Sequence, residues 1–106
     1  MTEEEQIKAI KQALEDKKAV DIRVYDVRGK SGLCNYHIVA TGSVGPHIKA
    51  LVAETQAVMK KAGVNSFRTA GDPESGWVLV DYIDIVVHAF TPEARAYYAI
   101  EKLWTK

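Results

Sequence analysis

Residues 77–90 read WVLVDYIDIVVHAF and contain two runs of β-branched and aromatic residues, at 77–82 and 85–90. Each run has the length and composition of one strand, and almost nothing separates the two. Strands joined by so short a connection pair antiparallel, because the chain must reverse its direction between them. The stretch therefore predicts a β-hairpin, and with it a sheet, in the C-terminal half of the chain.

Upstream of the hairpin, the spacing of apolar residues predicts two helices and three more strands. Residues 3–17 form an amphipathic helix that opens with a capping box of Thr2 and Glu5. A second helix begins near Pro46, where the first turn tolerates a missing N–H, and ends at Gly63. The strands are expected at 21–27, 33–41 and 64–69, with turns or loops at 28–32 and 71–76.

Downstream of the hairpin, Thr91-Pro92 is an N-cap followed by a first-turn proline, and it predicts a helix that continues through Trp104. The predicted order is α-β-β-α-β-β-β-α, within one domain over residues 1–106. The strand–helix–strand crossover is right-handed and makes part of the sheet parallel. The expected fold class is therefore α/β (α+β), a mixed five-stranded sheet flanked by helices.

The composition is that of an ordinary globular domain, with 47% hydrophobic and 26% charged residues and no net charge. The acidic residues 1–5 fit neither a secretory signal nor a transit peptide, and no apolar run approaches the roughly 18 residues of a membrane span. We therefore expect a cytoplasmic protein. The single cysteine, Cys34, excludes an intramolecular disulfide and a cysteine-based metal cluster.

Neither a phosphate-binding loop nor a histidine metal site is indicated by the sequence. Gly29-Lys30-Ser31 resembles the end of a phosphate-binding loop, but the first glycine of that motif would fall on Val24. His37, His47 and His88 are too dispersed for a metal-ligand set and are expected to be hydrogen-bonded structural residues. No cofactor and no metal ion are expected.

An enzymatic alternative stays open at this level. Gly42-Ser43 precedes a helix and could cradle a phosphate, and Asp81 with Asp84 could bind magnesium, as in nucleotidyltransferases. Those enzymes, however, place their acids two apart on one strand, facing the same way. Here the aspartates are three apart and bracket the turn of the hairpin, so a non-enzymatic protein is favoured.

Charge and aromatic residues indicate a protein partner. Between residues 72 and 101 there are six acids against one base, Arg95, which is unsuited to a phosphate backbone but suits a basic protein. Trp77, Tyr97, Tyr98 and Trp104 lie close to these acids, and aromatic anchors with a polar rim are typical of binding hot spots. The same aromatics could instead fill the core. A direct RNA-binding module, the third option, would need a basic, aromatic-lined groove.

The hairpin residues 77–82 and 84–90 resemble the signature of the Iojap/ribosomal silencing factor family. The resemblance covers nearly the whole chain and continues at Asp26, 29–31, Tyr36, 41–42, Glu93, Arg95, Tyr98 and 100–104. The chain departs from the family pattern at Asn35, Val44, Pro46, Gly76 and Ile83, the last standing where a glycine is usual. The departure at Ile83 leaves the geometry of the hairpin turn undetermined.

The resemblance implies a sheet related to nucleotidyltransferases without their catalytic acids, and a protein that is not an enzyme. It implies binding to the large-subunit ribosomal protein L-fourteen, where the bound factor prevents joining of the small subunit and represses translation in starvation. Organelle members act in large-subunit assembly. The residues expected to form or support the docking surface are Trp77, Asp81, Tyr82, Asp84, His88, Arg95, Tyr98, Glu101 and Trp104. No membrane and no sequence-specific nucleic acid is expected as a partner, and a homodimer is left open.

Overall fold

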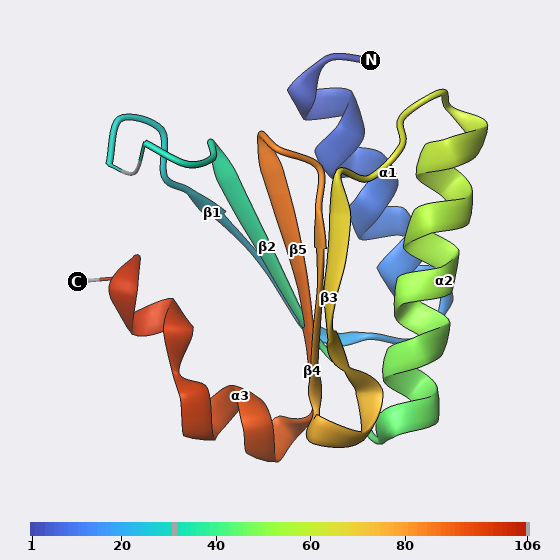
Figure 1. Cartoon of the computed structure of the whole chain (residues 1–106), viewed down its shortest axis with the longest axis vertical. Coiled ribbons are helices and arrows are strands. Elements are labelled where there is room, and N and C mark those ends of the chain that lie inside the picture. The colour runs from blue at the N-terminus through green and yellow to red at the C-terminus, as the bar shows by residue number, and fades with distance from the viewer. Residues whose placement is uncertain (31, 106) are drawn as a thin grey trace.

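One five-stranded sheet organises the chain in the computed structural model, which describes residues 1–30 and 32–105 (Figure 1). Ser31 of the rejected phosphate-loop motif lies outside the described residues. The elements are α1 (Glu3–Asp16), β1 (Val20–Asp26), β2 (Tyr36–Thr41), α2 (Gly45–Lys61), β3 (Arg68–Asp72), a short 3₁₀ helix η1 (Pro73–Ser75), β4 (Trp77–Asp81), β5 (Ile85–Phe90), α3 (Pro92–Tyr98) and a second 3₁₀ helix η2 (Ile100–Leu103). The predicted element order and the mixed α+β class are confirmed.

The strand order in the sheet is β1-β2-β5-β4-β3. The predicted hairpin is confirmed, since β4 and β5 pair antiparallel with Trp77 opposite Phe90 and Asp81 opposite Val86. The predicted crossover is confirmed too, because β2 and β5 are parallel neighbours and α2, β3 and β4 lie between them in the chain. The remaining neighbours are antiparallel.

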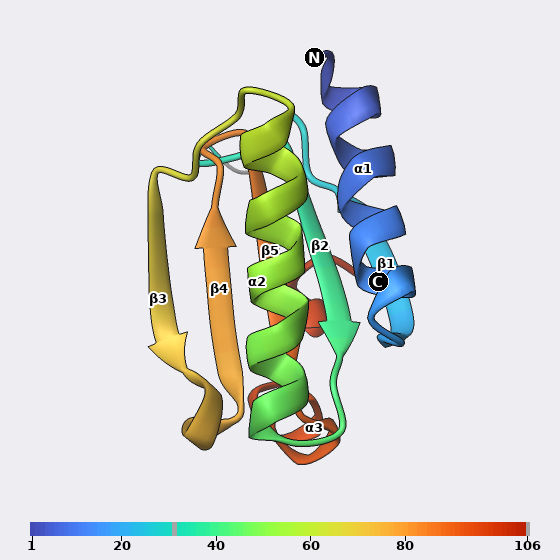
Figure 2. The ribbon, with the colours of Figure 1, turned by 90° about the vertical axis from the view of Figure 1, so that its right-hand side faces the viewer.

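Helices α1 and α2 cover one face of the sheet, here called the inner face (Figure 2). Strand alternation sends Ile38, Val80 and Val87 to this face, and Leu14 and Leu51 of the helices meet them. These side chains are at most 3% exposed. Burying each of them contributes about 1.5–3 kcal/mol, so this layer supplies most of the stability of the fold.

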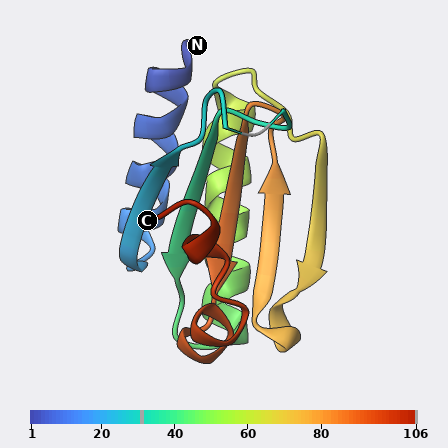
Figure 3. The same cartoon turned by 90° about the vertical axis from the view of Figure 1, so that its left-hand side faces the viewer.

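The opposite face, here called the outer face, is only partly covered. Figure 3 shows α3 and the C-terminal segment crossing β2 and β5, while β3 and β4 have no helix in front of them. A smaller core of Val39, Phe90 and Ala94 lies under the covering segment. The outer face of β3 and β4 is therefore the part of the sheet that no helix covers (Figure 3).

Both helix entries match the residues that predicted them. Thr2 and Glu5 form the capping box, each side chain accepting from the other's backbone N–H. Pro46 lies in the first turn of α2, although the N-cap Val44 offers no side-chain acceptor. The Nδ1 of His47 in the first turn accepts the N–H of Ser43 at 2.9 Å, which ties the residue before the N-cap to the helix.

Several predicted boundaries are wrong. The second strand begins at Tyr36, not at residue 33, because Asn35 is drawn into the turn at Asp84, whose carbonyl accepts its N–H. The third strand lies at Arg68–Asp72 instead of 64–69, so the expected loop 71–76 begins inside a strand. Pairing with β4 determines this position, since it places Ala70 directly opposite Leu79 in the sheet.

The last helix is shorter than predicted. Ala99 adopts a left-handed conformation with φ of +48°, which ends α3 at Tyr98 and starts η2 at Ile100. The break turns the chain back over the sheet, where Trp104 and Ile100 pack on the outer-face core. Tertiary packing of these apolar residues therefore overrides a continuous helix.

Candidate docking surface

The outer face of β4 carries Trp77, Leu79 and Asp81, because side chains two apart on a strand point the same way. All three are half-buried, whereas Val78 and Val80 between them are buried against the helices. Trp77 therefore lies on a partly exposed face of the sheet.

Trp77 is held by aromatic neighbours from two elements. Its ring stacks on Phe90 of β5, with centroids 4.9 Å apart, and lies 4.8 Å from the ring of Tyr98 of α3. Its indole Nε1–H donates to Nδ1 of His88 at 3.2 Å. The indole is therefore held by two neighbouring rings and at its polar edge, a rigid arrangement typical of binding anchors.

A shallow groove of about 240 Å³ lies beside Trp77 on the uncovered half of the outer face. It is lined by Ala70, Gly71, Ser75, Trp77, Leu79 and Tyr98. Its lining combines small residues with Leu79 and two aromatic rings. The groove is therefore mainly apolar and of a size that accepts one or two side chains of a partner.

Acids dominate the rim of the groove. Asp72 and Glu74 lie at its η1 end, and Asp81 lies at the far end of β4. Arg68 is paired with one of these acids, since its Nε lies 3.5 Å from a carboxylate oxygen of Asp81. An apolar groove with an acidic rim suits a basic protein surface, because complementary charges favour association and orient the partner.

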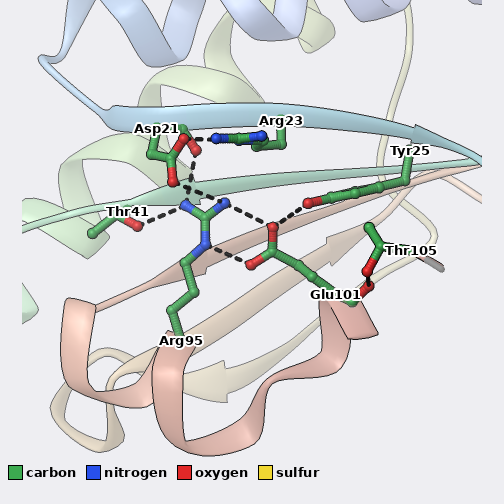
Figure 4. A network of polar contacts seen from close by, with 7 residues as sticks. All are labelled: Asp21, Arg23, Tyr25, Thr41, Arg95, Glu101 and Thr105. Atoms are coloured by element: carbon green, nitrogen blue, oxygen red, sulfur yellow. Dashed lines mark hydrogen bonds and ion pairs between the residues drawn. The ribbon is translucent and has the colours of Figure 1, made fainter. Parts of the chain in front are cut away.

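Arg95 and Glu101 form the centre of a polar network that fastens the C-terminal segment to the sheet (Figure 4). The guanidinium donates to both carboxylate oxygens of Glu101, at 2.6 and 2.9 Å, and to Oγ1 of Thr41 at 2.8 Å. The Tyr25 hydroxyl donates to Glu101, and Arg95 also reaches the backbone oxygen of Asp21.

This network is largely shielded from solvent, since the side chains of Arg95 and Glu101 are 11% and 21% exposed. The hydrogen bond from Arg95 lowers the pKa of Glu101, and burial raises the pKa of Tyr25. Both predicted residues therefore hold the segment that carries Trp104 in place and do not lie open on the surface.

Trp104 and His88 lie at the centre of the covered half. The Trp104 ring stacks on His37 with centroids 3.9 Å apart, and His37 Nδ1 lies 3.0 Å from Nε2 of His88. Burial lowers the pKa of His88 to about 3 and that of His37 to about 4. His37 was not predicted as a site residue, because only the parallel pairing of β2 with β5 brings it to His88.

The expectation that the histidines are hydrogen-bonded structural residues is confirmed. His47 lies apart from the other two and bridges the Ser43 N–H and the carbonyl of Lys17. Across residues 1–30 and 32–105, no group of three or more histidine, cysteine or acidic residues could hold a metal ion.

Two predicted site residues lie elsewhere. Tyr82 is 8% exposed and belongs to the inner core, where burial raises its pKa to about 12. Asp84 is exposed in the hairpin turn, beyond the end of β4. The structure thus brings together Trp77, Asp81, His88, Arg95, Tyr98, Glu101 and Trp104 on the outer face and separates Tyr82 and Asp84 from them.

The residues of the enzymatic alternative do not form one site. Gly42 follows β2, and its N–H donates to the carbonyl of Phe90, at the end of the sheet where β5 finishes. Asp81 and Asp84 lie at the opposite end, where β5 begins, roughly 16 Å away along the strand. Asp81 is also engaged by the N–H of Ile83 at 2.7 Å. A catalytic site using Gly42, Ser43 and both aspartates is therefore ruled out by the strand order.

The fold and the outer face define a small α+β domain with a half-covered mixed sheet and an aromatic surface beside an acidic rim. The family model described as "Ribosomal silencing factor during starvation" matches residues 1–106, and the chain belongs to this family. The resemblance seen in the hairpin and the tail is thereby confirmed.

Relatives agree with this assignment over most of their length. The ribosomal silencing factor of Chromobacterium violaceum is 43% identical over 93 residues, which cover 88% of this chain and 76% of that protein. The Bacillus subtilis factor is 34% identical, covering 98% of this chain and 88% of the relative. A crystal structure of a Chromobacterium violaceum protein, 43% identical, superposes with a TM-score of 0.93 and covers 98% of this chain and 87% of that one.

The family is named for regulation of the ribosome and not for an enzymatic activity. A mouse relative, 30% identical over 87% of this chain and 42% of its own length, is named for assembly of the mitochondrial large ribosomal subunit. Within the described part of the chain, no helix is both long and apolar enough to cross a membrane.

Proposed function

We propose that this protein binds the large ribosomal subunit in the cytoplasm through the groove beside Trp77 and its acidic rim. Its partner there is the ribosomal protein L-fourteen, and the bound factor sterically blocks joining of the small subunit. The observation that carries the proposal is the half-covered sheet, which leaves Trp77, Leu79 and Tyr98 open to a partner.

Rigidity of the surface supports a binding function. Trp77 is already ordered by Phe90, Tyr98 and His88 before any partner arrives. An anchor ordered in advance loses little conformational entropy on binding, so more of its contact energy appears as affinity. Such aromatic anchors commonly contribute about 2 kcal/mol or more to a protein interface.

The test is co-sedimentation of the purified protein with isolated large subunits, followed by addition of small subunits. We expect the protein to pellet with the large subunits and to reduce the amount of joined ribosomes. Trp77→Ala should weaken binding at least tenfold, because an anchor of about 2 kcal/mol is removed. Phe67→Ala is the matched control, an exposed aromatic that does not line the groove.

A pair of charged variants tests the character of the partner. Leu79 lies in the groove, so both Leu79→Lys and Leu79→Glu introduce a charge at the same place. A basic partner predicts that the lysine variant binds more weakly than the glutamate variant, and that added salt weakens binding by the parent. Equal binding by Trp77→Ala and the parent, with both proteins folded, would show that the groove beside Trp77 does not bind the large subunit.

A further inference from the structure

Four side chains form a continuous hydrogen-bonded chain across three strands of the outer face. Trp77 Nε1 lies 3.2 Å from His88 Nδ1, and His88 Nε2 lies 3.0 Å from His37 Nδ1. His37 Nε2 in turn lies 3.3 Å from the sulfur of Cys34, just before β2. This series of hydrogen bonds therefore connects Trp77 to residues on the far side of β5.

The Trp77 indole determines which atom donates and which accepts in each of these hydrogen bonds. An indole nitrogen can only donate, so Nδ1 of His88 must accept and must carry no proton. Neutral His88 then holds its proton on Nε2 and donates it to Nδ1 of His37. His37 is thereby protonated on Nε2, which points at the Cys34 sulfur, and every link has one donor and one acceptor.

The surroundings keep both imidazoles neutral. Burial, and after it the neighbouring His37, lower the pKa of His88 to about 3, against the opposing charge of Glu101 of η2. Burial likewise lowers the pKa of His37 to about 4 against the opposing charge of Asp81 on β4. The other ionisable groups nearby are the Cys34 thiol and the Tyr25 phenol, and burial raises the pKa of each.

We infer that His88, oriented by His37, is a positioning residue of the docking surface, which fixes the Trp77 indole by accepting its N–H. The inference rests on the proposed function. Stacking on Phe90 sets the plane of the indole but not which edge faces inward. The hydrogen bond to His88 sets that edge, so the indole is presented to a partner in a single orientation.

Proton positions can be measured without any partner. In a ¹⁵N-labelled sample at neutral pH, long-range ¹H–¹⁵N correlation should show unprotonated Nδ1 and protonated Nε2 in both His88 and His37. The indole N–H of Trp77, assigned with Trp77→Phe, should exchange slowly with water. An Nδ1-protonated tautomer in either histidine, or a freely exchanging indole, would overturn the inference.

The consequence for binding is tested with two variants at His88. His88→Asn keeps an acceptor near the position of Nδ1, whereas His88→Leu fills similar space without one. We expect His88→Leu to weaken binding to large subunits by roughly fivefold, the value of one hydrogen bond, and His88→Asn to retain more of the affinity. Thermal unfolding shows whether each variant is folded at the temperature of the assay.

A double variant separates positioning from general support of the fold. In a Trp77→Phe background there is no indole N–H, so His88→Leu should cause no further loss of binding. An equal loss in both backgrounds would show that His88 does not act through Trp77. If the parent itself fails to bind large subunits, the proposed function is wrong, while the proton positions and indole protection still decide whether His88 orients Trp77.

Discussion

Ile83 has a φ of +75°, a backbone region that is unfavourable for a β-branched side chain. It follows Tyr82 in the hairpin turn, and the residue is 58% exposed. Burial of the Ile83 side chain therefore does not offset the backbone strain. A residue of this kind in the left-handed region costs about 1–2 kcal/mol relative to glycine.

The first prediction is that Ile83→Gly stabilises the protein by about 1 kcal/mol, because relief of strain exceeds the greater entropy of the unfolded glycine chain. Urea denaturation measures the change. Val20→Gly is the control, since Val20 is equally exposed, at 62%, but has no positive φ and should lose stability. A loss of stability in Ile83→Gly would contradict this account of the turn.

At the scale of the elements, β3 and β4 approach closely at Gly71. A Cβ built on Gly71 would lie 2.2 Å from the backbone oxygen of Trp77, and the residue has a φ of +96°. Both conditions require glycine, and the clashing atom is backbone that cannot rotate away.

The second prediction is that Gly71→Ala costs about 3 kcal/mol or more and loosens β3 from β4, because a backbone shift is the one way to relieve the overlap. Gly63→Ala is the matched control, with a φ of +87° but open space around it, and should cost about 1 kcal/mol. Thermal unfolding compares the two, and equal losses would show that strain in φ, and not the close approach, is what matters.

Local sequence patterns predicted the helices and strands correctly wherever neighbouring residues determine the structure. The hairpin, the capping box of Thr2 and the entry of α2 at Pro46 depend on residues a few positions apart. The position of β3 and the break at Ala99 were missed because long-range packing sets both: one by pairing with β4, the other by docking of Trp104 on the sheet.

The same distinction applies to the candidate site. Strand alternation alone placed Trp77, Leu79 and Asp81 on one face. It could not show that His37 would lie beside His88, since this needs the parallel pairing of β2 with β5. Tyr82 was expected at the docking surface from the family resemblance alone, whereas strand alternation puts it on the same face as Val78 and Val80, where it is buried.

At the scale of the whole molecule, the paired histidines make stability depend on pH. Their folded pKa values of about 3 and about 4 lie below the ordinary 6.5, so the unfolded chain binds more protons as the pH falls. Stability is therefore complete above pH 6.5 and is lost below it. The slope approaches about 1.4 kcal/mol per pH unit for the buried His88 and is smaller for the partly exposed His37.

The third prediction is a steady fall in the free energy of unfolding from pH 6.5 to pH 4.5, measured by urea denaturation. Glu101 adds to the loss only below about pH 4.5, because its lowered pKa gives stability that disappears as the carboxylate is protonated. His37→Gln removes one of the two groups and should make the slope shallower. An unchanged slope in that variant would show that His37 does not contribute to the pH dependence of stability.

The parallel seam between β2 and β5 also has a consequence for how fast the chain folds. The seam joins residues from opposite halves of the chain, such as Tyr36 and Ile85, whereas the other neighbours are local or nearly so. Closing so long a loop costs entropy before the contacts of the seam form and offset it, so pairing of β2 with β5 is the slow step of folding.

Ile38→Val in the seam should then slow refolding, while Ala70→Gly in β3 should mainly speed unfolding. Because His37 and His88 come from its two strands, the proposed docking surface is assembled only once that step is complete.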